Sequence, residues 1–232
     1  MSRLSSLRIR DFMLPSLAPS LTHLKVIPEL LYAVDPKLCS HISTTEPYFA
    51  LSDTLTMFAH NIQRYSDISR LFDVLLAREQ VFTIYVFVQI VLNRRDELFA
   101  LENEPDMLHF TLSKLPSDLD IDAVILSAAE LFNKHPPESL RGWRSIPRAS
   151  VLKTARDVRV SASQTLKDGK ELFEQQLSDL HWADKMRAVS KYDTWQNRTA
   201  ILALLAGVAT AVYLRSKGGP AGGLGAALAD WL

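Results

Sequence analysis

Side chains that could carry out chemistry are few in this 232-residue chain, and none falls into a recognised catalytic pattern. The six histidines form neither an H-E-x-x-H motif nor a Cys/His cluster, so we expect no metal site. No glycine-rich loop follows a strand-like segment, and no serine lies in a nucleophile-elbow context. The sequence therefore predicts no catalytic residue, no metal ligand and no bound cofactor.

Single reactive groups have structural explanations instead. Cys39 is the lone cysteine, which excludes an internal disulfide, and we interpret it as a small buried side chain rather than a nucleophile. Arg70 and Asp73 lie one helical turn apart and predict a structural ion pair. Three histidines are predicted to be surface or capping groups: His60, His109 and His135.

The elements around these residues are organised about Ser66–Leu92, two apolar segments joined by a short polar connection. Ten of the twelve residues from Val81 to Leu92 are apolar. As a helix this run spans roughly 18 Å, which is too short for a bilayer core of about 30 Å. A strand is possible by propensity, but the length and the helical period of the neighbours favour a buried helix.

Helical signals continue on both sides of this run. Asp35-Pro36 is a helix-start signal, and Ser66 and Asp120 are candidate caps for later helices. Apolar residues recur at spacings of three and four from Leu51 to Ile62 and from Ile121 to Phe132. We expect about seven helices between Leu17 and His135, which makes an all-α domain with antiparallel neighbours.

The composition changes beyond this domain. Residues 141–198 are predicted to form a basic linker followed by a charged helical stalk, and the linker carries six basic residues against the single acid Asp157. A solvated linker is the simpler interpretation of the basic stretch, and a patch for a membrane surface or another anionic partner is the alternative. With 26 basic and 26 acidic residues in the whole chain, net charge predicts no nucleic-acid partner.

Residues 199–214 are predicted to form a transmembrane helix, because they include no charged side chain. Such a helix spans roughly 24 Å, and the flanking Arg198 and Arg215 can reach the two surfaces. Basic residues are more frequent before the span than after it, so we expect the N-terminal bulk in the cytosol. Asn197-Arg198-Thr199 is a formal glycosylation acceptor that opposes this orientation, and we interpret it as a chance match. Residues 215–232 form a short Gly/Ala-rich tail.

Several separated segments carry a family resemblance in the same order along the chain. The segments are Leu7–Leu14 (LRIRDFML), Phe49–Ser52 (FALS), Met57–His60 (MFAH), Ser69–Leu76 (SRLFDVLL), Leu112–Leu119 (LSKLPSDL) and Ala129–Pro137 (AELFNKHPP). Together they resemble the C-terminal half of the TBC domain, the all-helical catalytic unit of Rab GTPase-activating proteins, and above all its ER-resident branch with a C-terminal membrane span. Arg70–Asp73 is similar to the family's R-L-W-D-type helix, with Phe in place of Trp.

The resemblance implies chemistry that this chain does not contain. In the family, an arginine of an I-x-x-D-x-x-R motif stabilises the transferring phosphoryl group and a glutamine of a Y-x-Q motif positions water. Asp67–Arg70 and Asp184–Arg187 keep the D-x-x-R spacing, but Arg64 and His181 stand where the isoleucine would be, and no Y-x-Q occurs. No catalytic residue is therefore carried over from the family.

Two functions are compatible with these observations. The first is a Rab GTPase-activating protein that regulates ER-to-Golgi vesicle traffic, with residues 1–140 as the C-terminal half of a TBC domain and with both catalytic fingers lost by truncation. The second is a non-catalytic, tail-anchored helical adaptor that binds a Rab or another traffic protein. In both cases the expected partners are a Rab-type small GTPase and a membrane, at the endoplasmic reticulum or early Golgi, with a single span.

Overall fold

The computed structural model describes residues 2–101, 104–192, 207, 210 and 212–213 of the chain. Two compact units share these residues, Met1–Leu177 and Ser178–Leu232, and each is considered by itself. Every regular element in the described ranges is helical, which confirms the all-α prediction. In the first unit the helices are α1 (Ser2–Leu7), η1 (Arg10–Met13), α2 (Ala18–Leu24), α3 (Val26–Val34), α4 (Pro36–Ile42), η2 (Pro47–Ala50), α5 (Leu51–Thr56), α6 (Tyr65–Ala77), α7 (Phe82–Asn93), α8 (Arg95–Ala100), α9 (Pro105–Leu112), α10 (Ile121–Lys134), η3 (Pro137–Ser139), η4 (Gly142–Ser145), α11 (Val151–Thr154) and α12 (Val158–Ser163), and α13 (Leu166–Tyr192) begins there.

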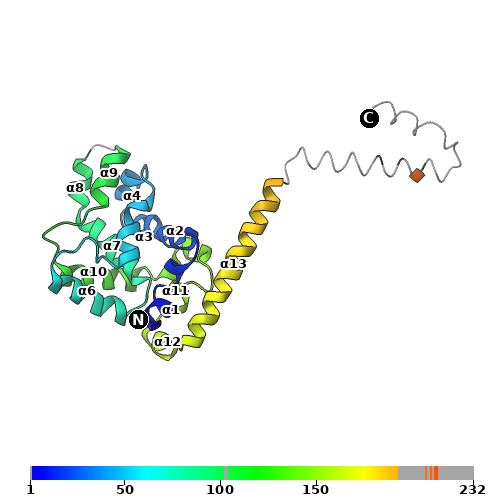
Figure 1. The fold of residues 1–232 in the computed structure, drawn as a ribbon. Coiled ribbons are helices and arrows are strands. Elements are labelled where there is room, and N and C mark those ends of the chain that lie inside the picture. Colours follow the sequence, from blue (N-terminus) through cyan, green and yellow to red (C-terminus); the bar gives the residue numbers. More distant parts are fainter. Residues whose placement is uncertain (1, 102–103, 193–206, 208–209, 211, 214–232) are drawn as a thin grey trace. The chain divides into compact units, whose positions relative to one another are not determined.

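Helix α7 is the centre of the first unit, with α3 and α10 packed against it (Figure 1). Every side chain from Val81 to Val88 is buried, so the prediction of a buried helix rather than a strand is confirmed. Aromatic contacts fix its neighbours, because Phe49 stacks on Phe87 with ring centroids 5.9 Å apart and Phe132 meets Tyr85 edge-on at 4.9 Å. Burying each such side chain contributes about 1.5–3 kcal/mol to the free energy of folding, which explains why the other helices pack around α7.

Helix ends follow the sequence signals only in part. Asp35 accepts a hydrogen bond from the Leu38 amide at 2.9 Å, and Asp120 accepts one from the Ala123 amide at 3.0 Å, so these two caps are confirmed. The expected Ser66 cap is wrong, because α6 already begins at Tyr65 and the extended residue before it is Arg64.

The apolar pattern from Leu51 to Ile62 does not make one continuous helix. Helix α5 ends at Thr56, and Met57 and Phe58 follow with the left-handed φ angles of 50° and 68°. The Phe58 amide donates to the Asp53 carbonyl at 2.9 Å, which closes the turn. The turn ends the helix and places Phe58 in the core, where it is fully buried. This burial offsets the strain of the left-handed backbone, which is of order 1–3 kcal/mol per residue.

The basic stretch after residue 140 is not a solvated linker along its whole length, so that prediction is wrong for its apolar positions. Trp143 on η4 and Ile146 after it join the apolar core, and Val151 and Leu152 on α11 are buried with them. Apolar residues at turn-like spacing pull this segment onto the core and leave its charged side chains outside.

No helix in the described ranges is long and apolar enough to cross a bilayer. The predicted span at 199–214 lies outside the described residues except for positions 207, 210, 212 and 213. The predicted tail at 215–232 lies entirely outside them.

Candidate functional site

The two D-x-x-R segments place their arginines in surface ion pairs. Arg70 Nε lies 2.8 Å from Asp122 Oδ1 on α10, so the predicted pair of Arg70 with Asp73 is wrong. Arg64 forms an ion pair with Asp67, and Arg64 Nη2 lies 2.7 Å from Asp67 Oδ2.

The second D-x-x-R segment lies on α13, where Arg187 Nη1 is 3.5 Å from Asp184 Oδ1. Both members of this pair are largely exposed, as are Arg70 and Asp122 in the first. Exposed pairs of this kind contribute about 0–1 kcal/mol. The arginine of each segment is thus held by a neighbouring carboxylate among the described residues.

A buried polar cluster is built around the carboxylate of Asp11 in η1. Its Oδ2 lies 2.8 Å from His23 Nε2 on α2 and accepts from Ser150 Oγ at 2.5 Å. Its Oδ1 accepts from the Val151 amide at 3.0 Å and from Gln176 Nε2 on α13 at 2.8 Å. Burial alone would raise the pKa of Asp11, but the hydrogen bonds and the His23 charge outweigh it and hold that pKa below its ordinary value.

Arg10 completes this cluster. Its Nε donates to Gln176 Oε1 at 2.7 Å, its Nη1 donates to the Ser6 carbonyl at 2.7 Å, and its Nη2 reaches the Ala149 carbonyl and Thr154 Oγ1. The guanidinium is 1 % exposed, so its donors satisfy carbonyl and amide oxygens that would otherwise be buried without partners. The cluster therefore joins η1, α2, α11 and the first turns of α13 into one body.

The Asp11–His23–Ser150 group has the residue types of a hydrolase triad but not its geometry. Ser150 Oγ donates to the aspartate, and its distance to His23 Nε2 is 3.4 Å, so the histidine is not placed to take the serine proton. All three residues are at most 3 % exposed, which leaves no path for a substrate. The group is structural. No local sequence signal points to this group, because its partners lie far apart along the chain.

A second buried arginine caps a helix. Arg8 donates through Nη2 to the carbonyl of Leu75 at 2.6 Å and to the carbonyl of Arg78. These are carbonyls at the C-terminal end of α6, which have no partner within the helix. A cation at this end also interacts favourably with the helix dipole.

Asp53 on α5 is a buried carboxylate with one strong partner. Asn61 Nδ2 donates to its Oδ1 at 2.8 Å, while Oδ2 has no hydrogen-bond partner among the described residues. Desolvation dominates over the Asn61 bond and the His60 charge, and it raises the pKa of Asp53 to about 6. The side chain lies beside the left-handed Met57–Phe58 turn, not in a cleft that a substrate could enter.

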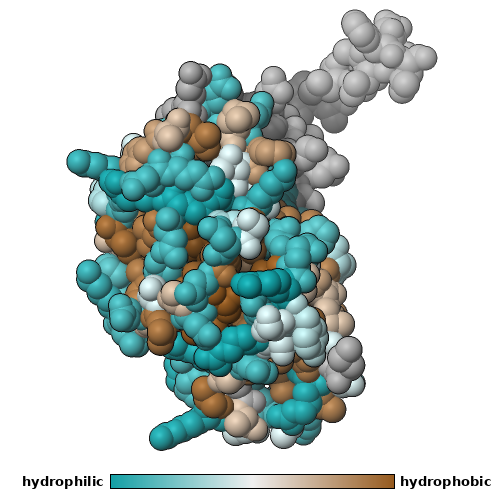
Figure 2. Space-filling view, turned by 90° about the vertical axis from the view of Figure 1, so that its left-hand side faces the viewer, coloured by the Kyte–Doolittle hydropathy of each residue, from teal (hydrophilic) through white to brown (hydrophobic). Residues whose placement is uncertain are grey.

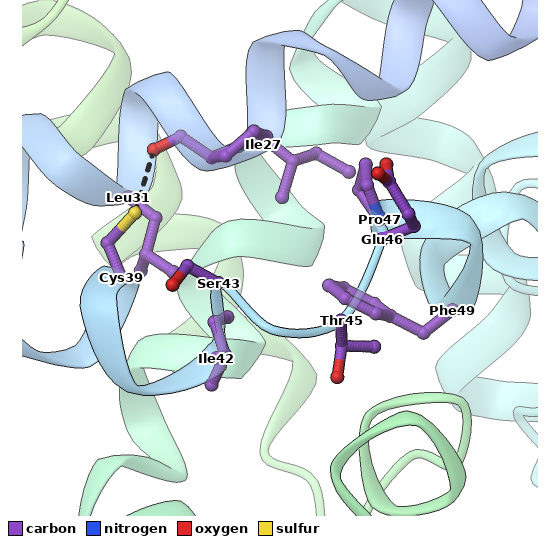
Figure 3. A pocket seen from close by; sticks show the side chains of 10 residues that line it. Ile27, Leu31, Cys39, Ile42, Ser43, Thr45, Glu46, Pro47 and Phe49 are labelled. Atoms are coloured by element: carbon purple, nitrogen blue, oxygen red, sulfur yellow. Dashed lines mark hydrogen bonds between the residues drawn. The ribbon is translucent and has the colours of Figure 1, made fainter. Parts of the chain in front are cut away.

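A pocket of about 180 Å³ opens between α3, α4 and the segment before η2 (Figure 3). Its walls are mainly apolar, with Ile27, Leu31 and Phe49 lining it. Cys39 also lines it, and its thiol donates to the Pro28 carbonyl at 3.3 Å. Burial raises the pKa of Cys39, so the thiol stays protonated, which supports the interpretation of Cys39 as a packing residue.

The face that carries α6, α8, α9 and α10 shows hydrophobic side chains between hydrophilic ones (Figure 2). On these helices the large apolar side chains with the highest exposure are Tyr65 at 84 %, Leu126 at 67 % and Phe110 at 54 %.

Comparisons with known proteins agree with the resemblance seen in the sequence. Residues 1–99 match the model of the family described as the Rab-GTPase-TBC domain. The chain is 32 % identical over 145 residues to GTPase-activating protein gyp10 of Schizosaccharomyces pombe, covering 60 % of this chain and 39 % of that protein. It is 30 % identical over 194 residues to TBC1 domain family member 20 of Bos taurus, covering 82 % of this chain and 46 % of that protein. The chain thus spans less than half the length of these relatives.

Proposed function

We propose that this chain is the partner-binding C-terminal part of a GTPase-activating protein for a Rab-type small GTPase, because residues 1–99 match the family model described as the Rab-GTPase-TBC domain. The observation that carries the proposal is the family match over an all-helical unit centred on the buried α7. Two relatives, named as a GTPase-activating protein and as a TBC1 domain family member, support it.

The division of labour in this proposal follows from the chemistry. Accelerated GTP hydrolysis needs a cation on the developing phosphoryl charge and a group that positions water. These 232 residues contain neither the I-x-x-D-x-x-R nor the Y-x-Q motif, and the arginines with related spacing lie in surface ion pairs. The chain therefore supplies the scaffold and a binding face, and by itself it binds a GTP-loaded Rab without accelerating hydrolysis.

The proposed setting is the cytosolic side of the endoplasmic reticulum or early Golgi membrane, in ER-to-Golgi traffic. Residues 1–140 are the partial TBC domain, 141–198 connect it to the membrane, and 199–214 form the single span before a tail at 215–232. The uncharged run at 199–214 with its flanking arginines supports the anchor.

A tail-anchored adaptor that binds a Rab without ever taking part in hydrolysis is the second candidate, and the missing finger motifs favour it. A fusion separates the two functions. A TBC segment that carries both an I-x-x-D-x-x-R and a Y-x-Q motif is joined ahead of Met1, and GTP hydrolysis is measured with a panel of GTP-loaded Rabs. A restored rate supports the activator. Tight binding with no restored rate for any Rab overturns it in favour of the adaptor.

A further inference from the structure

An uncompensated positive charge is concentrated in one segment of the first unit. Residues 141–163 contain six basic residues and one acidic residue, although the whole chain is neutral. Five of the six are exposed arginines: Arg141, Arg144, Arg148, Arg156 and Arg159. The sixth, Lys153, is partly buried, donates to the Ile146 carbonyl and lies 5.6 Å from the Trp143 ring.

The segment holds these arginines on a fixed frame rather than on a flexible linker. Trp143, Ile146, Val151 and Leu152 anchor its backbone in the core. The Gln80 amide also donates to the Ala155 carbonyl at 3.2 Å, which ties the end of α11 to the connection between α6 and α7. A preorganised set of cations loses less conformational freedom on binding than a mobile one.

The charge is not neutralised within the described part of the chain. None of the five exposed arginines forms an ion pair there, whereas Arg64, Arg70 and Arg95 elsewhere on the surface each pair with an aspartate. The one acid of the segment, Asp157, accepts a hydrogen bond from the Val160 amide at 2.8 Å and caps α12. The arginines are therefore free to meet an external anion.

Apolar side chains are exposed at the C-terminal end of this segment, next to Arg159. A groove of about 460 Å³ runs between α1, the end of α6 and α12, lined by Leu4, Leu76, Val158 and Ala162 together with Arg3. Val158 is 54 % exposed and Leu76 is 45 % exposed. Val158 and Ala162 share one face of α12, directly beside Arg159 in sequence. Cations next to exposed apolar groups are typical of surfaces that enter the headgroup region of a bilayer.

We propose that the exposed arginines of residues 141–163, together with the α12 groove, dock on the surface of a membrane rich in anionic phospholipid. Guanidinium groups bind phosphate oxygens through paired hydrogen bonds, and the groove receives the adjoining acyl region. A membrane fits better than a nucleic acid, because a phosphodiester backbone would leave the exposed apolar groove unused. This membrane contact would orient the first unit at the bilayer surface, and it does not depend on Rab binding.

The test uses the purified 232-residue chain reconstituted into phosphatidylcholine vesicles, so that any insertion of residues 199–214 is already complete. These are then mixed with separate labelled vesicles of phosphatidylcholine alone or with phosphatidylserine, whose binding is followed. The test variant replaces Arg144, Arg148, Arg156 and Arg159 by Gln. The matched control changes the same number of charges on exposed positions of α13, replacing Lys167, Lys170, Lys185 and Arg187 by Gln. Bound fraction is measured by flotation at low and at high salt, and Rab binding is measured on all three proteins.

Wild type is expected to bind anionic vesicles more tightly than neutral ones. Each arginine near the surface should raise the affinity for anionic vesicles about fivefold. The test variant should lose at least tenfold of this preference, while the control and all binding to neutral vesicles stay unchanged. Equal binding to both vesicle types, or an equal loss in the control, overturns the proposal. Retention on heparin that needs the four arginines, without any lipid preference, overturns it in favour of another polyanion. Failure of Rab binding with the lipid preference intact refutes only the proposed function.

Discussion

Replacing Asp53 by Asn should stabilise the protein at neutral pH. The buried carboxylate has a pKa of about 6 instead of 3.8, because desolvation penalises its charged form and only Asn61 compensates. A raised pKa means that the folded state binds more protons than the unfolded chain between these two values. Stability from this group is therefore fully present below about pH 4 and is lost as pH rises through about 6.

The magnitude follows from the size of the shift. At 1.36 kcal/mol per pKa unit, keeping Asp53 ionised costs about 3 kcal/mol of unfolding free energy at pH 7.5. An asparagine is neutral at every pH, its Oδ1 can still accept from Asn61, and its amide replaces the oxygen that has no partner. The variant should melt about 5–10 °C higher at pH 7.5 and nearly unchanged at pH 4.

Thermal unfolding of the full chain in mild detergent, followed by circular dichroism at both pH values, measures this difference. Asp73→Asn is the matched control, because Asp73 is an exposed carboxylate on the neighbouring α6 and its loss should change little at either pH. An Asp53→Asn variant that is destabilised at pH 7.5, or that gains equally at pH 4, would refute the burial argument.

Three further changes test other parts of the account. Asp11→Ala leaves buried donors on His23, Ser150 and Gln176 without an acceptor. The free energy of unfolding, measured in urea at pH 7, should fall by about 3–5 kcal/mol, and a fall of under 1 kcal/mol contradicts the cluster's structural role. Because the pKa of Asp11 is lowered, wild type should also lose stability as pH falls below about 4, and Asp11→Asn should reduce that loss. If the free energy of unfolding of Asp11→Asn falls with acid as steeply as that of wild type, this role of Asp11 is wrong. Deleting residues 201–214 should release the protein into the soluble fraction of fractionated cells, and continued membrane retention would argue against the span.

Local patterns predicted the centre of the fold well. The apolar run of Val81–Leu92 could only be buried, and its helical neighbours supplied the layers around it. Asp35 and Asp120 were readable as caps because capping needs only a side chain and an amide three positions later. Such features depend on residues close in the sequence, which is why the sequence alone was sufficient.

Features that depend on distant contacts were not predicted. The left-handed turn at Met57–Phe58 exists because Phe58 is buried by the rest of the domain, and the periodic pattern pointed instead to an uninterrupted helix. The Asp11 cluster uses Ser150 and Gln176, 139 and 165 positions further on. The six basic residues of the 141–159 stretch predicted a solvated linker, but its apolar residues Trp143 and Ile146 pack in the core.

The rate of GTP hydrolysis on a saturated complex tests the central claim most directly. A GTP-loaded Rab that binds the full-length chain in a pull-down is mixed with increasing amounts of it, and single-turnover hydrolysis is followed by phosphate release. The account predicts saturable binding with the intrinsic rate unchanged, because both finger motifs are missing from these residues. Stimulation approaching the 10³–10⁵-fold that an arginine finger provides, by the unmodified chain, would contradict it.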